Sequence, residues 1–348
     1  MQEVHPKRDI RKLKPDELKK FFIEQGDKPF RATQVDEWLW KKSAKSFDQM
    51  TNLSVATRDL LKQNFTINHI HVDTMQRSAD GTIKNAVKLH DGLIVESVLI
   101  PAEKRITACV SSQVGCSLAC KFCATARLKR QRNLSADEIY DQVAAIKEQS
   151  ETIFNRPLTN IVFMGMGEPL LNYANVTAAI DKITSPKGLG MAMKRITVST
   201  VGIAKMIIKM ADDGVKFNLA VSLHAAIDGT RSSIMPINDS NPLSELAAAL
   251  KYWYQKTKRK VTYEYVVWQD VNDTPEHAQA LLKFAQIIPS KVNLIEYNPI
   301  YEGGFKQAGD DVLRMYMDLL EKHGITTRIR KSRGKDIDAA CGQLANKG

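Results

Sequence analysis

The spacing of apolar side chains changes along the chain, and each change predicts a change in secondary structure. Near the N-terminus apolar residues recur every three or four positions, the period of a helix with one buried face. From Ile67 the period approaches two, which predicts strands, and Asp80-Gly81 between two such stretches is typical of a hairpin turn. This first part therefore predicts helices over residues 14–23, 33–40 and 54–64 and a strand over residues 93–100.

From Ile106 onward, strand-like and helix-like segments alternate. One helical pattern begins at Ser135, and Glu138 follows it at the spacing of a capping box. Strands that alternate with helices predict a parallel sheet curved into a partial barrel, whose chemistry lies at the carboxyl ends of the strands. The predicted strands cover residues 106–110, 160–164, 195–199, 217–223, 261–268 and 292–297, followed by a helix over 311–323 and a possible last strand over 325–329.

These patterns predict an α/β protein with four regions. We expect a helical accessory domain over residues 1–66 and a β-hairpin extension over residues 67–104. A partial (βα)6 barrel would follow over residues 105–325, and a C-terminal tail over residues 326–348.

Composition places the chain among globular proteins and argues against a membrane protein. The hydrophobic share of 43% and the charged share of 26% are near the averages for soluble domains. No segment approaches the roughly 18 uninterrupted apolar residues of a membrane span, and the first residues lack the apolar core of a signal peptide. The five cysteines gather around one loop rather than forming a disulfide framework, so we expect a cytoplasmic location.

The charge balance points to a polyanionic partner. The formal net charge is +11, an excess that favours binding to nucleic acid through counterion release. Basic residues concentrate in three runs. A single basic run is usually a solvent-exposed surface, but two of these runs flank, in sequence, the motifs described next, which favours contact with the substrate. The runs cover residues 127–132, 256–260 and 328–335.

Three cysteines form the most specific motif of the chain. Cys116, Cys120 and Cys123 make a CxxxCxxC loop that supplies three thiolates, whereas a four-iron cluster normally takes four. One iron would then keep an open coordination position for a ligand, as catalytic metals do. The alternative is a structural zinc site with Cys109 as the fourth thiolate, but zinc motifs usually come as paired CxxC knuckles rather than one crowded loop.

With Phe122 before its last cysteine, this loop resembles the cluster motif of the radical S-adenosylmethionine (SAM) superfamily. The resemblance implies that Cys116, Cys120 and Cys123 hold a [4Fe-4S] cluster whose open iron binds the amino and carboxylate groups of SAM. It also implies that an electron from the cluster releases a 5′-deoxyadenosyl radical, and that the barrel is a radical SAM barrel.

A second motif follows the second barrel strand. In Met164-Gly-Met-Gly-Glu-Pro169 an apolar strand ends in two glycines, a carboxylate and a proline, and glycine lets the backbone approach a ligand closely. Taken alone, this run is more simply explained as a tight strand-to-helix turn that binds no ligand. Its position at a strand end and its resemblance to the GGEP motif of radical SAM enzymes imply that Gly167 and Glu168 bind the SAM ammonium group.

Other strand ends carry weaker signals. The third, fourth and sixth strands end in small hydroxyls, one histidine and one asparagine. A lone histidine in such a place is more often a structural hydrogen-bonding residue. Because all these positions would face one barrel mouth, we expect contacts to SAM from Ser199, Ser222, Leu223, His224 and Asn298.

Cys341 lies in a polar tail, where a single cysteine would ordinarily be incidental. Together with the motifs above, however, it resembles the radical SAM RNA methyltransferases that act on adenine C2 or C8. The resemblance covers about residues 90–345. It implies that Cys341 carries the methyl group, that Cys109 is the second catalytic cysteine, and that Glu96 contacts the substrate adenine as an acid/base; otherwise Glu96 would be an outward-facing strand carboxylate.

The electronics of adenine explain such machinery. C2 lies between two ring nitrogens and is too electron-poor to attack the methyl group of SAM, whereas a carbon radical adds there. The resemblance implies two SAM per turnover: one methylates Cys341, and the other yields the radical that removes hydrogen from the S-methyl group. The methylene radical then adds to C2, and Cys109 takes the proton and forms a transient disulfide bond with Cys341. Reduction of that disulfide resets the enzyme.

Several alternatives remain open on the sequence. Gly167-Glu-Pro-Leu170 and the N-terminal helices favour the branch that methylates C2 in 23S rRNA and tRNA over the resistance branch that methylates C8. Ala126 departs from a glycine common among relatives, which leaves the local loop geometry open. A zinc-stabilised RNA-binding module without activity, and a radical SAM enzyme acting on a protein or small molecule, are the other classes. The expected partners are 23S rRNA, tRNA and an electron donor such as flavodoxin or ferredoxin, and the chain is expected to work as a monomer.

Overall fold

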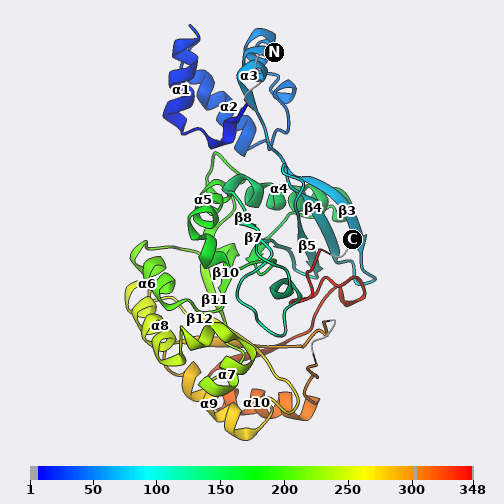
Figure 1. Ribbon diagram of the computed structural model, residues 1–348, viewed down its shortest axis with the longest axis vertical. Coiled ribbons are helices and arrows are strands. Elements are labelled where there is room, and N and C mark those ends of the chain that lie inside the picture. Colours follow the sequence, from blue (N-terminus) through cyan, green and yellow to red (C-terminus); the bar gives the residue numbers. More distant parts are fainter. Residues whose placement is uncertain (1–6, 301–303, 347–348) are drawn as a thin grey trace.

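The structure is a computed structural model that describes residues 7–300 and 304–346. Its N-terminal part forms a lobe of three helices that stands apart from the barrel at one end of the molecule (Figure 1). Ser54 caps the third helix by accepting a hydrogen bond from the backbone N–H of Thr57. The lobe confirms the helical expectation and consists of α1 (Pro15–Glu24), α2 (Phe30–Trp40) and α3 (Val55–Asn64).

Buried charges join this lobe to the first barrel helix, α4 (Ala136–Phe154). The guanidinium of Arg11, which precedes α1, lies 2.7 Å from Asp141 and 3.4 Å from Asp137, both on α4. Tyr140, also on α4, donates a hydrogen bond to the carbonyl oxygen of Trp40. Because breaking a buried ion pair leaves an uncompensated charge, these contacts hold the lobe at one position on the barrel.

A ten-stranded mixed sheet forms the centre of the molecule. Its barrel part is parallel, as the alternating pattern predicts, and the possible last strand is confirmed because β14 pairs in parallel with β13. The barrel strands are β6 (Arg105–Cys109), β9 (Asn160–Phe163), β10 (Ile196–Thr200), β11 (Asn218–Ser222), β12 (Val261–Val266), β13 (Ser290–Ile295) and β14 (Thr326–Arg330).

Helices surround the outer face of this sheet (Figure 1). The capping box predicted at the start of α4 is present, with Ser135 and Glu138 satisfying each other's backbone N–H groups. The other helices are α5 (Tyr173–Thr184), α6 (Ala204–Asp212), α7 (Asp228–Ile234), α8 (Leu243–Thr257), α9 (Pro275–Ala285) and α10 (Asp310–Lys322). Short 3-10 turns cover Ile10–Lys12, Phe47–Gln49, Ala124–Arg127, Pro169–Asn172, Met193–Arg195, Pro236–Asp239 and Lys335–Ile337.

The hairpin extension continues the barrel sheet instead of forming a separate sheet. Strands β3 (His71–Arg77), β4 (Ile83–Lys88) and β5 (Ile94–Ala102) are antiparallel, and the turn at Asp80-Gly81 joins the first two. Strand β5 then pairs antiparallel with β6, the first barrel strand. Residues on β5 are therefore held close to the barrel mouth.

Two pairs of very short strands were not predicted, because two residues are too few for a periodic pattern. The pair β1 (Arg8–Asp9) and β2 (Phe65–Thr66) ties the beginning of the helical lobe to its end. The pair β7 (Gln113–Val114) and β8 (Arg132–Asn133) brackets the loop that carries the CxxxCxxC motif. This second pair closes the base of the loop.

Among the helices of the described residues, none has both the length and the apolarity needed to cross a bilayer.

Candidate active site

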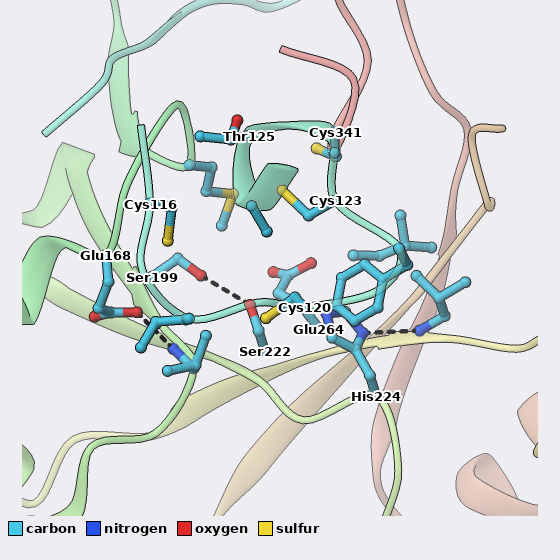
Figure 2. A pocket seen from close by; sticks show the side chains of 18 of the residues that line it. Cys116, Cys120, Cys123, Thr125, Glu168, Ser199, Ser222, His224, Glu264 and Cys341 are labelled. Atoms are coloured by element: carbon cyan, nitrogen blue, oxygen red, sulfur yellow. Dashed lines mark hydrogen bonds between the residues drawn. The ribbon is translucent and has the colours of Figure 1, made fainter. Parts of the chain in front are cut away.

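A cavity that is partly open to solvent lies at the carboxyl ends of the barrel strands. Figure 2 shows loop cysteines, strand-end side chains and the tail cysteine directed into it. Of the residues predicted to form the site, those that line the cavity are Cys116, Cys120, Cys123, Gly167, Glu168, Ser199, Ser222, His224, Asn298 and Cys341.

The loop between β7 and β8 has a backbone shaped to direct its cysteines inward. Gly115 has a φ of +74°, and a side chain there would lie 2.5 Å from the carbonyl oxygen of Lys129. Ala119 also has a left-handed backbone, with a φ of 54°, which costs free energy for a residue with a Cβ. Ala126, by contrast, lies in the 3-10 turn Ala124–Arg127 and is not among the described residues with positive φ, so the loop needs no glycine there.

The donor set of this loop fits an iron–sulfur cluster. Burial raises the pKa of all three loop thiols, and the negative charge of Cys123 raises it further at Cys116 and Cys120. Bound positive charge, such as that of a metal, would therefore favour three thiolates packed together. In the part of the chain that the structure describes, no three Cys, His, Asp or Glu side chains converge closely enough for a single ion. A zinc ion needs thiolates about 2.3 Å away, whereas a cluster spans a larger gap between ligands.

Two buried polar atoms of cavity-lining side chains fit a polar ligand. The Oδ1 atom of Asn298 and the Oε2 atom of Glu264 are buried and have no hydrogen-bond partner. Buried polar atoms normally have partners, and each orphan costs about 1–3 kcal/mol. Both atoms belong to side chains that line the cavity, so a polar ligand such as SAM would satisfy them.

Glu168 is fixed at the end of β9 by hydrogen bonds from two backbone N–H groups. Its Oε1 accepts from Leu170 and its Oε2 from Val201, each at 2.9 Å. The side chain is buried, and burial raises the pKa of this carboxyl to about 7. A bound ammonium group would favour the charged carboxylate of Glu168. The arrangement therefore suits the binding of the SAM ammonium group that the GMGEP run predicts.

Gly167 allows the chain to approach Gln113 closely. Its φ is +90°, and a Cβ would lie 2.5 Å from the Cβ of Gln113 and 2.9 Å from its backbone nitrogen. We expect Gly167→Ala to lower the free energy of unfolding by about 2 kcal/mol or more and to weaken SAM binding. Chemical denaturation and equilibrium dialysis with SAM would measure both effects.

Gly229→Ala is the matched control, because a Cβ at Gly229, on α7, would meet nothing within 4 Å. Alanine is the better helix former, so this variant should be as stable as the original chain or slightly more stable. Equal stability of the two variants would contradict the close packing described at Gly167.

The third and fourth strand ends place two serines and a histidine together. The hydroxyls of Ser199 and Ser222 are 3.5 Å apart. His224 has a left-handed backbone, with a φ of 56°, and its Nδ1 accepts a hydrogen bond from the N–H of Val266. Burial lowers the pKa of His224 to about 3, so the ring is neutral. Leu223 is fully buried and does not line the cavity.

Hydrogen bonds to the cluster loop and to the sixth strand end position the tail cysteine. Asn298 donates from Nδ2 to the carbonyl oxygen of Cys341 at 3.2 Å. On the other side, the N–H of Ala124 donates to the carbonyl oxygen of Gly342 at 2.7 Å, and the Thr125 hydroxyl to that of Leu344 at 2.6 Å. The tail therefore packs directly beside Cys123 and presents Cys341 to the cavity (Figure 2).

Cys109 lies at the end of β6 and is buried outside the cavity lining. Burial raises the pKa of its thiol to about 12, and the charge of Cys341 adds to this effect. All five cysteines are free thiols, so the structure does not support the expected disulfide bond.

Glu96 is also absent from the cavity lining, and it is engaged by the tail. Its side chain on β5 is buried, and its Oε2 accepts hydrogen bonds from the N–H groups of Ala345 at 2.7 Å and Asn346 at 3.1 Å. The ammonium of Lys84 lies 3.4 Å from Oε1. Glu96 is therefore not an outward-facing carboxylate, and an adenine could reach it only after these tail residues move.

Several residues of the site were missed from the sequence, among them three with charged side chains. Arg231 is fully buried and binds the carbonyl oxygens of Leu223 and Val201, thereby joining two strand ends. Glu264 and Arg330 line the cavity on neighbouring parts of the barrel. Only Glu264 carried a signal that could have been used, because it is a lone carboxylate inside the apolar strand β12.

Part of the basic character noted in the sequence is used internally. Arg132 pairs with Glu138 at 2.8 Å and with Asp91 at 2.6 Å, and Lys335 pairs with Glu296. Arg330 faces Glu264. These three cations therefore make ion pairs within the protein.

Comparisons with known proteins agree with this geometry. Residues 8–67 match the ribosomal RNA large subunit methyltransferase N-terminal domain, and residues 110–285 match the radical SAM superfamily. The chain is 65% identical over 341 residues to a probable dual-specificity RNA methyltransferase RlmN from Christiangramia forsetii, covering 98% of this chain and 97% of the relative. The protein of the same name from Salinibacter ruber is 43% identical over 348 residues, with 98% and 94% covered.

A solved structure shares the whole fold. The crystal structure of a radical SAM methyltransferase from Sphaerobacter thermophilus is 36% identical and superposes with a TM-score of 0.91, over 97% of this chain and 99% of that one. The match extends from the helical lobe to the barrel.

Proposed function

The chain belongs to the RlmN family of dual-specificity RNA methyltransferases within the radical SAM superfamily, and from this premise we propose that it methylates C2 of adenine in 23S rRNA and in tRNA. The observation that carries the proposal is the position of the tail. Hydrogen bonds hold Cys341 in the same cavity as the three loop cysteines. A mobile, incidental cysteine would not be held in this way.

The cavity residues divide into groups with separate tasks. When bound at Cys116, Cys120 and Cys123, the cluster supplies the electron that splits SAM into methionine and a 5′-deoxyadenosyl radical. Glu168 receives the SAM ammonium group, and the orphaned Oδ1 of Asn298 accepts a hydrogen bond from the ligand. The other proposed SAM contacts that line the cavity are Gly167, Ser199, Ser222 and His224.

The two catalytic cysteines would act on the methyl group in turn. Cys341 accepts a methyl from one SAM and, after hydrogen abstraction that uses the second SAM, carries the methylene radical that bonds to C2. The thiol of Cys109 is protonated while substrate is absent. It must lose this proton before it can accept a proton from the adduct that the methylene group forms with C2 of adenine. As Cys109 then bonds to the sulfur of Cys341, the bond from that sulfur to the methylene carbon breaks, this carbon takes up a proton, and the unpaired electron of the adduct passes to the one-electron carrier. A one-electron donor such as flavodoxin or ferredoxin, and a reductant for the disulfide, complete the cycle.

Glu96 is proposed to contact the adenine once the tail releases it. We expect Glu96→Gln to lower RNA methylation by about 10²- to 10⁴-fold, the usual contribution of a general acid or base. Methylated Cys341 should still form, because that step does not involve the adenine. Nucleoside analysis and peptide mass spectrometry would measure the two outcomes separately.

Deletion of residues 345–348 is the control, since it removes the N–H groups that Glu96 binds and keeps the carboxylate. If Glu96 served only to anchor the tail, the deletion and Glu96→Gln would reduce methylation equally. A deletion variant that retains most of its activity supports the contact with adenine.

The proposed function is tested by anaerobic incubation of the cluster-loaded chain with SAM, a reductant and unmodified 23S rRNA or tRNA. The expected product after digestion is 2-methyladenosine from both RNAs. Formation of 8-methyladenosine would place the chain in the resistance branch. Zinc without acid-labile sulfide in the purified protein, and no product, would instead favour an RNA-binding module.

A further inference from the structure

The turn that joins β3 to β4 binds the C-terminal tail, which lies beside it in Figure 1. The hydroxyl of Ser78 donates a hydrogen bond to Oδ1 of Asp336 at 2.6 Å, and the N–H of Ala79 donates to Oδ2 of the same carboxylate at 3.0 Å. In the other direction, Oδ2 of Asp80 accepts a hydrogen bond from the N–H of Gly334 at 3.0 Å. None of these five residues lines the cavity, so this contact is separate from the candidate active site.

Hydrogen bonds within the turn hold these groups in place. The N–H of Ser78 donates to the carbonyl oxygen of Thr82 at 2.8 Å, and that of Gly81 donates to the carbonyl oxygen of Ser78 at 3.0 Å. The N–H of Thr82 donates to Oδ1 of Asp80 at 2.9 Å, which leaves Oδ2 for the tail. Groups that are already ordered lose little conformational entropy on binding, so the turn offers a preformed site.

The part of the tail that the turn binds is itself a closed loop. The N–H of Ala339 donates to the carbonyl oxygen of Gly334 at 2.9 Å, and the 3-10 turn Lys335–Ile337 lies between them. Gly334 has a φ of +67°, and a Cβ there would lie 2.8 Å from the Cβ of Ala339 and 2.9 Å from Cγ2 of Thr82. This glycine therefore lets the closed loop pack tightly against the hairpin turn.

Only Ala340 separates this closed loop from Cys341. Ala340 is buried, and its N–H donates to Oε1 of Gln343 at 3.2 Å. Beyond Cys341, the cluster loop donates hydrogen bonds to the carbonyl oxygens of Gly342 and Leu344. The tail is therefore fixed on both sides of Cys341, by the hairpin turn before it and by the cluster loop after it.

We propose that Ser78, Asp80 and Asp336 form a clasp that positions Cys341 for its part in methyl transfer. Each residue of a chain has two soft backbone dihedral angles, so a tail fixed on one side alone could enter the cavity in several directions. Anchors on both sides restrict the position of the Cys341 sulfur. Because the clasp lies outside the cavity lining, its members are positioning residues and not catalytic residues.

This inference rests on the proposed function and concerns two of its steps. In the first, the Cys341 thiol takes the methyl group of SAM, which gives S-methylcysteine, S-adenosylhomocysteine and a proton. In the second, the 5′-deoxyadenosyl radical takes one hydrogen atom from the S-methyl group, which gives 5′-deoxyadenosine and the methylene radical. A displacement of about 1 Å can slow such steps about 10²-fold. Loss of the clasp should therefore slow the steps at Cys341 and leave the binding of the cluster and of SAM unchanged.

Asp336→Ala removes both hydrogen bonds that the carboxylate accepts from the turn. In anaerobic hydrogen–deuterium exchange of the cluster-loaded chain, we expect the amides of residues 339–344 to exchange about tenfold faster than in the wild type, with the barrel strands unchanged. Formation of S-methylcysteine at Cys341, measured by peptide mass spectrometry, should slow about tenfold. More 5′-deoxyadenosine should form per methylated adenine, because radicals that miss the S-methyl group are lost. A smaller amount of folded protein would not change this ratio.

Ser78→Ala is a milder variant, because the N–H of Ala79 can still bind Asp336. It should change tail exchange and both chemical measurements in the same direction, by a smaller factor. Asp73→Ala is the matched control, since Asp73 is an exposed carboxylate on β3 and lies outside the turn. This variant should match the wild type in all three measurements.

Equal tail exchange in Asp336→Ala and Asp73→Ala would overturn the inference. So would faster tail exchange in Asp336→Ala with no change in S-methylcysteine formation or in the 5′-deoxyadenosine ratio. A loss of iron or of SAM affinity as large as the loss of methylation would also overturn it, since the hairpin turn would then support the whole cavity. Failure of the wild-type chain to methylate RNA would refute the proposed function, whereas the difference in tail exchange between the two variants would remain.

Discussion

Cys341→Ala is expected to abolish RNA methylation, lowering turnover by about 10³-fold or more as in other enzymes that lose their covalent nucleophile. No other thiol can take over, because Cys109 is buried outside the cavity lining and the remaining cysteines belong to the cluster loop. The variant should still bind SAM and keep its iron. Nucleoside mass spectrometry and metal analysis would measure these properties.

Gln343→Ala controls for damage to the tail. Gln343 bonds the backbone of Ala340 and Pro299 and so helps to position the tail, but it carries no reactive group. We expect this variant to lose activity only in part. Methylation by Cys341→Ala at a rate similar to that of Gln343→Ala would show that the tail has a structural role and does not carry the methyl group.

Cys120→Ser is expected to remove the cluster. Cys120 is a buried member of the loop triplet, and a serine hydroxyl does not provide the thiolate that iron binds in such clusters. Iron and acid-labile sulfide should fall to a small fraction of the wild-type content, and reductive cleavage of SAM should stop. Colorimetric iron and sulfide assays, with detection of 5′-deoxyadenosine, would follow both losses.

Cys109→Ser is the matched control, because the substitution is the same and the residue lies outside the cluster loop. It should retain the cluster and cleave SAM while failing to release methylated RNA. If Cys109→Ser lost metal as completely as Cys120→Ser, Cys109 would be a ligand, as the zinc alternative requires.

Much of the barrel could be predicted because its signals are local. Apolar runs and helical periods identified each barrel strand, and the ends of those strands placed Glu168, Ser199, Ser222 and Asn298 in one cavity. A parallel sheet brings the carboxyl ends of its strands together, regardless of the conformation of the loops between them. The capping box at Ser135 was found for the same reason, since it depends on only four consecutive residues.

The contacts that were missed join residues distant in the sequence. Glu96 binds Ala345 and Asn346, about 250 positions away, and no periodic pattern records such a contact. The pairing of β5 with β6, which continues the hairpin into the barrel sheet, depends on register and not on composition. In the sequence, Arg330 belongs to a basic run that is expected to be exposed to solvent. In the structure, its guanidinium forms an ion pair with Glu264.

The measurement that tests the account most directly is multiple-turnover methylation of a 23S rRNA fragment with SAM that carries a trideuterated methyl group. The account predicts 2-methyladenosine whose methyl group has lost one deuterium, because hydrogen is abstracted from the methyl group on Cys341 before the carbon bonds to C2. A product that keeps all its methyl deuterium would contradict the route through Cys341, since the methyl group would then have moved intact from SAM to RNA.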